Sequence, residues 1–274
     1  MTSDPHIAAY QELLAAPCEP PSSLSGDGIM IELFQRVMLI NLRRRPDRLA
    51  SFFGQDEMKS WPFRAVDIHD ACDGWAAPLP PGWNSGSGSY GCRNSHVAVL
   101  RKAIEDGIDS IFVLEDDAFL CPRFTERAAS FLAILPSDWD ALFLGGQHRG
   151  RRETSALGVT RCFNVQRTHA YALRGKCIKG VCNLWAGMTT GHIDHRAGDW
   201  QPQWNVYAPD PFLIGQAGGK SDIRCVHEPL RFWSNVPGVN QTATGRTKHK
   251  HVRLCDTIAH YAPRQTTLET VAAR

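Results

Sequence analysis

Short apolar runs alternate along the middle of the chain with stretches that have the periodicity of amphipathic helices. The runs contain few polar residues, as is typical of strands buried on both faces of a sheet. The predicted strands are residues 37–42, 63–67, 111–114, 140–146 and 170–173. The predicted helices are residues 48–59, 92–105, 124–135 and 175–185. This alternation predicts an α/β fold with a Rossmann-like, mainly parallel sheet and flanking helices.

The two ends of the chain differ from this middle part. Residues 1–30 contain one helical stretch, 7–16, followed by a proline-rich segment, which together predict an arm or a linker. The C-terminal part of the chain is rich in loop-forming residues. We therefore divide the chain into an N-terminal arm at 1–30, a main domain at 31–235 and a basic C-terminal extension at 236–274.

Composition narrows the class of protein. The chain has 274 residues, of which 43% are hydrophobic and 21% charged, as in an ordinary globular protein. The net charge of +2 does not indicate a nucleic-acid binder. No apolar stretch has the length of a membrane span, and the N-terminus lacks the regions of a signal peptide. The nine cysteines are scattered without zinc-finger spacing, so we expect free thiols in the cytoplasm.

Three consecutive carboxylates follow the third predicted strand, at Glu115, Asp116 and Asp117. Like charges at the end of a buried strand repel one another, and a divalent cation relieves that repulsion because it takes oxygen ligands. Side chains alternate along a strand, so Glu115 and Asp117 are expected to point the same way. We predict Asp117 as a direct metal ligand and Glu115 as a second one, with Asp116 completing the contact through metal, water or ribose. The alternative is a solvated acidic turn.

Polar residues or glycines also follow other predicted strands. Asn41, Asp67 and the pair Gly145-Gly146 occupy positions equivalent to Asp116. Ligands of parallel sheets bind at the carboxyl ends of strands. We therefore predict that these residues converge on one edge of the sheet.

Four segments, in this order, resemble the sequence blocks of glycosyltransferase family 25. They are residues 40–48, 63–67, the Gly-Cys-Arg-Asn-Ser-His block at 91–96, and 114–117. The likeness extends over roughly residues 36–225. This family includes lipooligosaccharide galactosyltransferases and collagen galactosyltransferases.

The resemblance implies a GT-A type fold and an inverting transfer of a hexose from a UDP-sugar. It also implies Mn²⁺, or Mg²⁺ in its place, as the cofactor. The hexose is glucose or galactose. The family usually has an acidic residue ahead of the Gly-Cys block, where this chain has Ser89-Tyr90, so the identity of the sugar stays open.

Two arginines past the first strand are candidates for binding the donor diphosphate, because arginine pairs bidentately with phosphate. They are Arg45 and Arg48, whose alternative interpretation is a solvated basic helix start. Further donor-binding candidates for the base, ribose or phosphates are Asn41, Leu42, Asp67, Ser95, His96 and Asp116. Among these, Asp67 is equally a turn or helix cap, and His96 is equally a half-buried structural histidine.

An inverting transfer needs a base that takes the proton of the acceptor hydroxyl. Asp194 is the predicted base, because its segment 191–196 matches a family position that carries an aspartate. His195 is the predicted third metal ligand, with His192 and His227 as alternatives. The glycine-rich stretch 215–223 resembles the family's late Ser-Asp-Ile block.

Two classes of acceptor fit the sequence, a saccharide of the lipooligosaccharide type and a hydroxymethylpyrimidine in DNA. The second rests on basic segments, 149–152 and 246–253, and on tryptophans that could stack on bases, Trp200, Trp204 and Trp233. The alternative for the basic segments is solvated surface, and the tryptophans could instead stack on sugars or fill the core. Two other functions are also compatible with the acidic run. One is a metal-dependent phosphodiesterase or nuclease, and the other is a noncatalytic module that binds a nucleotide sugar.

Overall fold

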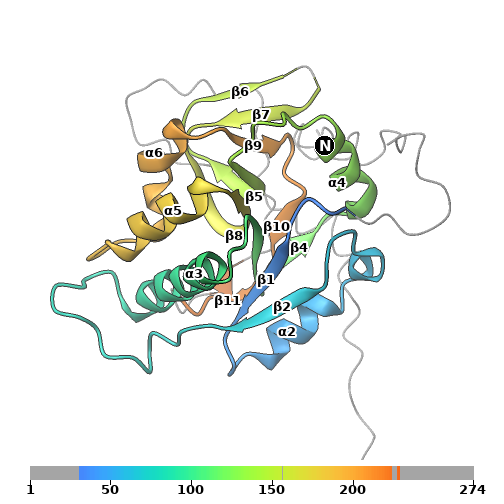
Figure 1. Cartoon of the computed structure of the whole chain (residues 1–274). Helices are drawn as coiled ribbons and strands as arrows, with labels where there is room; N and C mark the ends of the chain where they lie inside the picture. Colours follow the sequence, from blue (N-terminus) through green and yellow to red (C-terminus); the bar gives the residue numbers. More distant parts are fainter. Residues whose placement is uncertain (1–30, 156, 224–226, 229–274) are drawn as a thin grey trace, which may run out of the picture.

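The computed structural model describes residues 31–155, 157–223 and 227–228 of the chain (Figure 1). The predicted N-terminal arm at 1–30 and C-terminal extension at 236–274 lie outside the described residues. The helices are α2 (Pro46–Phe53), α3 (Ser87–Glu105), α4 (Phe124–Ala133), α5 (Lys176–Ala186) and α6 (Ala197–Trp200). Short 3₁₀ helices are η1 (Asp56–Ser60), η2 (Ile193–Arg196) and η3 (Gln201–Gln203).

One large sheet organises the described part of the chain, with strand order β2-β1-β3-β8-β5-β9-β7-β6. Its strands are β1 (Arg36–Asn41), β2 (Val66–Asp70), β3 (Ser110–Glu115), β5 (Ala141–His148), β6 (Arg152–Thr154), β7 (Val159–Cys162), β8 (Val165–Arg174) and β9 (Val206–Pro209). Two small antiparallel pairs join β4 (Ala118–Leu120) to β10 (Ile214–Gln216), and β11 (Gly219–Lys220) to β12 (His227–Glu228).

The predicted α/β fold with flanking helices is confirmed, and the sheet is mixed. Strands β2, β1 and β3 run parallel, and β5 runs parallel to β9. Strand β8 lies between β3 and β5 and is antiparallel to both. The chain passes from β5 to β8 through the strands β6 and β7, whereas a parallel connection requires a crossover. The parallel arrangement expected from the sequence therefore holds only for part of the sheet.

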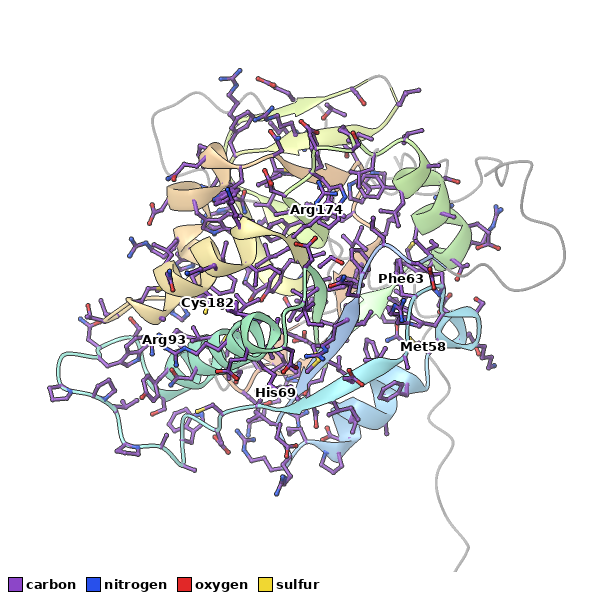
Figure 2. The ribbon with its side chains drawn as sticks, in the orientation of Figure 1. Met58, Phe63, His69, Arg93, Arg174 and Cys182 are labelled. Carbon is purple, nitrogen blue, oxygen red and sulfur yellow. The ribbon has the colours of Figure 1, made fainter. Side chains whose placement is uncertain are left out.

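Each central strand is buried on both faces, which explains the nearly continuous apolar runs. In β3, Ile111 and Val113 pack in one cluster with α3, α5 and α6, while Phe112 and Leu114 pack in the other with α2 and α4. Figure 2 shows Cys182 on the α3 and α5 side and Phe63 on the opposite side. Two helical layers thus cover the sheet, and its strand ends at one edge are left to build a site.

Several element boundaries differ from the predicted ones, and these differences move candidate residues. Helix α2 ends at Phe53 because Gly54 follows it, and η1 takes up part of the predicted remainder. Strand β2 extends to Asp70, so Asp67 lies near its start, is exposed, and pairs in register with Met38. The prediction that Asp67 ends this strand was wrong.

Strand β5 continues to His148, so the pair Gly145-Gly146 lies inside the strand and does not end it. A Cβ atom at Gly145 would lie 2.4 Å from His169 Nε2 and 2.5 Å from the Ile214 carbonyl oxygen. The glycine is needed for this close packing of β5 against β8 and β10. Its expected place at the sheet edge is therefore corrected to a packing role.

Candidate active site

The carboxyl ends of β1 and β3 meet at one edge of the sheet, as the parallel register requires. The Asp116 N–H donates to the Ile40 carbonyl at 3.1 Å, and Asn41 Nδ2 donates to Asp116 Oδ2 at 2.7 Å. These two bonds fix the acidic turn against the end of β1. Asn41 is buried and therefore positions Asp116, whereas the sequence had suggested a contact with the donor base.

Two adjoining cavities open at this edge, of about 110 Å³ and about 240 Å³. Glu115, Asp117, Arg48 and Cys92 line both of them. The smaller cavity is also lined by Leu42, Asp116 and residues of the loop after β2. The larger cavity is also lined by residues of η2. The acidic turn therefore forms the boundary that the two cavities share.

Arg48 faces two of the three carboxylates of the acidic turn. Its Nη1 lies 3.1 Å from Asp116 Oδ1 and its Nη2 lies 2.5 Å from Asp117 Oδ2. Gln216 Nε2 donates to the same Asp117 Oδ2 at 3.0 Å. The other oxygen, Asp117 Oδ1, is buried and has no hydrogen-bond partner within the described part of the chain. A single guanidinium thus faces a turn that carries three carboxylates, and one carboxylate oxygen still needs a donor or a cation.

The environment shifts the pKa values of the three acids in different directions. Burial raises the pKa of Asp116 to about 7, although Arg48 opposes the shift. Burial also raises the pKa of Asp117, again against Arg48 and with the help of the Glu115 charge. For Glu115 burial acts in the same sense, but hydrogen bonds from His96 and Thr168 outweigh it and lower the pKa to about 2. Glu115 is therefore the carboxylate that the protein most firmly keeps ionised.

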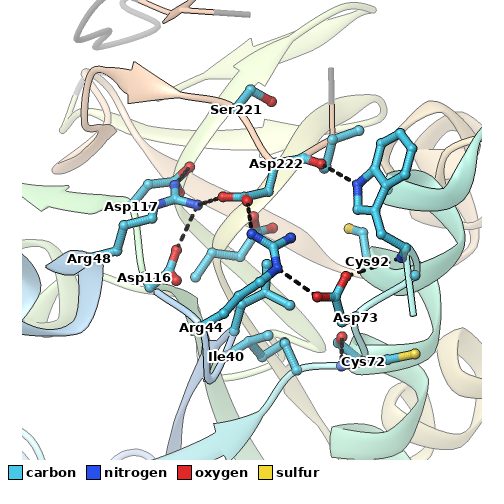
Figure 3. A pocket seen from close by; sticks show the side chains of 18 of the residues that line it. Ile40, Arg44, Arg48, Cys72, Asp73, Cys92, Asp116, Asp117, Ser221 and Asp222 are labelled. Atoms are coloured by element: carbon cyan, nitrogen blue, oxygen red, sulfur yellow. Dashed lines mark hydrogen bonds and ion pairs between the residues drawn. The ribbon is translucent and has the colours of Figure 1, made fainter. Parts of the chain in front are cut away.

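Three arginines gather around Asp222, which comes from the segment after β11. We call Arg44, Arg45, Arg48 and Asp222 the arginine cluster. Figure 3 shows Arg44, Arg48 and Asp222 of this cluster. Arg44 Nη1 lies 2.6 Å from Asp222 Oδ1, Arg45 also pairs with this carboxylate, and Arg48 Nη1 is 3.4 Å from Oδ2. Arg44 additionally pairs with Asp73, and Trp75 Nε1 donates to the Asp222 carbonyl at 3.2 Å. Arg45 and Arg48, predicted to bind phosphate, thus hold carboxylates in this structure.

Polar groups of α3 and β8 hold Glu115. We call Cys92, His96, Thr168 and Glu115 the histidine cluster. Thr168 Oγ1 donates to Glu115 Oε1 at 2.7 Å, and His96 Nε2 lies 3.3 Å from the same oxygen. His96 is 1% exposed, and its Nδ1 is 3.0 Å from the Tyr171 hydroxyl. His96 therefore orients Glu115 from the core.

The predicted base and third metal ligand lie in the larger cavity together with Asp117. Asp194 and His195 belong to η2, and His195 Nε2 is 3.9 Å from Asp194 Oδ1. The Asp194 side chain is 17% exposed, whereas that of His195 is 62% exposed. His192 lines the cavity as well, and His227 belongs to β12 outside it. The structure therefore brings Asp194 to the same cavity as the acidic turn.

Ser95 lines the smaller cavity, but its hydroxyl already forms hydrogen bonds with backbone groups. Its hydroxyl donates to the Gly91 carbonyl at 2.7 Å and accepts from the Cys72 N–H at 2.9 Å. It fastens α3 to the loop after β2. Leu42, which was predicted to contact the donor, lines the smaller cavity, whereas Asp67 lines neither cavity.

Sequence reasoning missed several residues of the site. Arg44, Asp73 and Trp75 line the smaller cavity, and Arg167 and Thr168 line the larger one. Asp73 and Trp75 lie in a loop without periodicity, and Thr168 lies in a part of β8 that precedes the predicted strand. Of these missed residues, Arg44 could have been found from the sequence, because it is adjacent to the predicted Arg45.

The tryptophans considered as stacking residues have different positions. Trp200 is buried in the cluster beside α3 and α5, and Trp204 packs against that cluster. Trp200 therefore fills the core, one of the roles that the sequence had left open. Trp233 and the basic segment 246–253 lie outside the described residues. Over the described part of the chain, no helix is both long and apolar enough to span a membrane.

Comparison with known families identifies the chain. The sequence profile of glycosyltransferase family 25 (LPS biosynthesis protein) matches residues 34–176, from just before β1 to the start of α5. This match covers more than half of the 274 residues. The chain belongs to glycosyltransferase family 25, as its four sequence blocks had indicated.

Individual relatives are distant. The chain is 29% identical over 169 residues to the inactive glycosyltransferase 25 family member 3 of Homo sapiens, covering 52% of this chain and 27% of that protein. It is 21% identical over 294 residues to procollagen galactosyltransferase 2 of Mus musculus, covering 88% of this chain and 45% of that protein. The chain thus spans less than half the length of these relatives.

Solved structures show a weak general likeness. A glycosyltransferase involved in the glycosylation of the major capsid of PBCV-1 has 10% identity and a TM-score of 0.39, with 64% of this chain and 81% of that chain covered. A nucleoside-diphosphate-sugar pyrophosphorylase from Vibrio cholerae has 13% identity and a TM-score of 0.33, with 73% and 87% covered. Likeness at this level adds nothing to the family assignment.

Proposed function

We propose that this chain is a metal-dependent, inverting glycosyltransferase that moves a hexose from a UDP-sugar to a hydroxyl acceptor. The observation that carries the proposal is the acidic turn: Asp117 Oδ1 is buried without a hydrogen-bond partner among the residues that the structure describes, and Asp117 lines the same cavity as Asp194. Membership of family 25 supports the reaction class. The name of the mouse relative, a galactosyltransferase, favours galactose over glucose as the hexose.

The residues present fit a hard divalent cation such as Mn²⁺. Asp117 would hold it through Oδ1, and Glu115, which the protein keeps ionised, would be the second carboxylate ligand. Asp116 is less available, because Asn41 and Arg48 already engage its two oxygens. His195 stays the predicted third ligand. When bound, such a cation acts as a Lewis acid that neutralises charge on the leaving diphosphate.

The arginine cluster supports binding of the donor diphosphate. Arginine pairs bidentately with phosphate, and a diphosphate carries more charge than the single carboxylate of Asp222. Arg44 and Arg48 line the smaller cavity, and both contact Asp222. In our proposal the diphosphate replaces Asp222 on these guanidinium groups.

Asp194 is the proposed base, and its position in the cavity that Asp117 also lines supports this role. The acceptor hydroxyl oxygen attacks the anomeric carbon of the hexose, and its proton passes to the Asp194 carboxylate. The bond from that carbon to the diphosphate oxygen breaks, and its electron pair leaves with UDP. One displacement of this kind inverts the anomeric configuration.

For the acceptor, a saccharide is the better supported class. The family description refers to LPS biosynthesis, and burial of Trp200 removes one of the stacking residues that had suggested modified DNA. A nuclease is less well supported, because a two-metal site needs further carboxylates and Asp222 is engaged by three arginines.

A second candidate function is a noncatalytic module that binds a nucleotide sugar. It is favoured by the name of the human relative, an inactive family member. Calorimetric titration of UDP with and without Mn²⁺ tests the donor site in both cases. Turnover of UDP-galactose or UDP-glucose on oligosaccharide acceptors then separates the enzyme from the binding module. UDP binding that is absent in both conditions would overturn the proposed function.

A further inference from the structure

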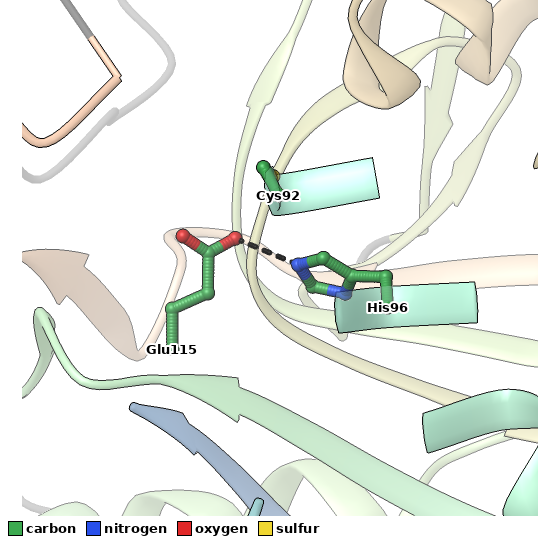
Figure 4. A group of neighbouring side chains, drawn as sticks. All are labelled: Cys92, His96 and Glu115. Atoms are coloured by element: carbon green, nitrogen blue, oxygen red, sulfur yellow. Dashed lines mark hydrogen bonds and ion pairs between the residues drawn. The ribbon is translucent and has the colours of Figure 1, made fainter. Parts of the chain in front are cut away.

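Three side chains of metal-ligating type, Cys92, His96 and Glu115, form a cluster that shares only Glu115 with the acidic turn. The proposed transfer reaction assigns no role to Cys92. Cys92 and His96 are four residues apart on α3, so they project from the same helix face toward Glu115 at the end of β3 (Figure 4). One ligand atom from each of the three residues lies within 4.8 Å of the others. His96 Nε2 and Glu115 Oε1 are 3.3 Å apart.

The histidine already has the outer partner that a metal-binding imidazole needs. A ligating histidine is oriented by a hydrogen bond at its other ring nitrogen. His96 Nδ1 lies 3.0 Å from the hydroxyl of Tyr171, which is fully buried and fixed in β8. A tyrosine hydroxyl accepts as well as donates, so it serves the tautomer that leaves Nε2 free for a metal.

The cluster is also accessible to an ion. Cys92 and Glu115 line both cavities at the sheet edge, and the buried His96 lines the smaller one. An ion that enters the smaller cavity therefore reaches all three ligands. The side toward the cavities is left for water, which resembles the three-ligand arrangement of open zinc sites.

The ligand chemistry selects a different metal from that of the acidic turn. Thiolate and imidazole favour Zn²⁺ and related ions, whereas carboxylate oxygens alone favour Mg²⁺ and Mn²⁺. We propose that Cys92, His96 and Glu115 form a second cation site, which binds Zn²⁺ or Co²⁺. On binding, the Cys92 thiol releases its proton to solvent and coordinates as the thiolate.

The two sites share Glu115, so they compete for it. Zn²⁺ at the second site withdraws Glu115 from the ion held by Asp117 and lowers Mn²⁺-dependent transfer. This inhibitory consequence rests on the proposed function, whereas the binding of Zn²⁺ does not.

Titration of the whole chain with Co²⁺ tests the site directly, because thiolate ligation gives a charge-transfer absorption in the near ultraviolet. We expect this band in the wild type and expect Zn²⁺ to abolish it by displacing Co²⁺. Cys92→Ser should lose the band, and Cys72→Ser should keep it. Cys72 is the matched control, since it is a half-buried free thiol that lines the smaller cavity outside the ligand set. Absence of the band in the wild type, or its persistence in Cys92→Ser, would overturn the proposal.

A second measurement needs no variant and covers the case in which Cys92→Ser does not fold. Alkylation of the native protein, followed by peptide mass spectrometry, gives the reaction rate of each cysteine. Zn²⁺ should slow the modification of Cys92 and leave that of Cys72 unchanged. Equal rates for Cys92 with and without Zn²⁺ would contradict the site. UDP titrations with Mn²⁺ on the same sample report separately on the proposed function, so failure of one is distinguishable from failure of the other.

Discussion

The arginine cluster and the histidine cluster hold carboxylates at the same sheet edge by different means. Asp222 is surrounded by permanent charges on three side chains that are 19–44% exposed. Glu115 is held by the hydroxyl of Thr168 and the imidazole of His96, which is anchored in the core. Charge pairs of the first kind can exchange one anion for another, whereas the second arrangement fixes one carboxylate in place. The site therefore has an exchangeable side and a fixed side.

The largest effect is expected from Arg48, which contacts both Asp222 and the acidic turn. Arg48→Met leaves the buried Asp116 and the half-buried Asp117 without their cationic partner, and breaking such a pair costs about 3–5 kcal/mol. Chemical denaturation should show this loss in the free energy of unfolding. Arg43→Met is the control, since Arg43 is 85% exposed and pairs with the exposed Asp70. Equal stability of the two variants would mean that Arg48 does not neutralise the acidic turn.

Asp117→Asn tests the proposed metal ligand that lines both cavities. It removes the carboxylate proposed to hold the cation, and transfer should fall by about 10²–10³-fold, the size typical of losing one transition-state stabiliser. The measurement is kcat on a UDP-hexose with saturating Mn²⁺. Asp56→Asn serves as the control, because Asp56 is 85% exposed and pairs only locally with Lys59. Undiminished turnover in Asp117→Asn would contradict the metal assignment.

Glu115→Gln tests the fixed side through its pH dependence. The folded-state pKa of about 2 lies below the ordinary value of 4.5, so ionised Glu115 stabilises the fold above pH 4.5. That contribution, about 3 kcal/mol, is lost as pH falls from 4.5 through about 2. Unfolding of wild type and variant across this range should therefore show a stability difference that shrinks toward acid. A difference that does not change with pH would show that the hydrogen bonds, not the charge, matter.

The smallest effect is expected on the exchangeable side. Asp222→Asn removes the anion that competes with the diphosphate, and UDP should bind more tightly by about 1 kcal/mol, or roughly fivefold in Kd. Calorimetry with Mn²⁺ measures the change. Asp47→Asn removes a carboxylate that pairs with Arg45 outside both cavities, and should leave the affinity unchanged. Weaker binding in Asp222→Asn would mean that Asp222 positions the arginines and does not compete with the donor.

Local pattern was sufficient for four strands of the large sheet and for part of the site. Apolar runs located β1, β3, β5 and β8, because strands buried on both faces leave a continuous trace in the sequence. The acidic run and Asn41 were correctly expected to meet, since parallel neighbours bring their carboxyl ends to one edge. The prediction for Asp67 was wrong because β2 spans Val66–Asp70, whereas the predicted strand was 63–67. A boundary shift of a few residues moves a side chain from the end of a strand to its start.

The family, the α/β layers and the acidic turn at the end of β3 could be inferred from the amino-acid sequence, because each depends on residues that lie close together along the chain. The three-dimensional arrangement was needed to learn that Asp117 Oδ1 has no partner among the described residues, that Asp222 faces three arginines, and that Thr168 and His96 hold Glu115. These partners are separated by tens to more than a hundred residues. Their meeting depends on sheet order and on the direction of β8, which no local pattern encodes.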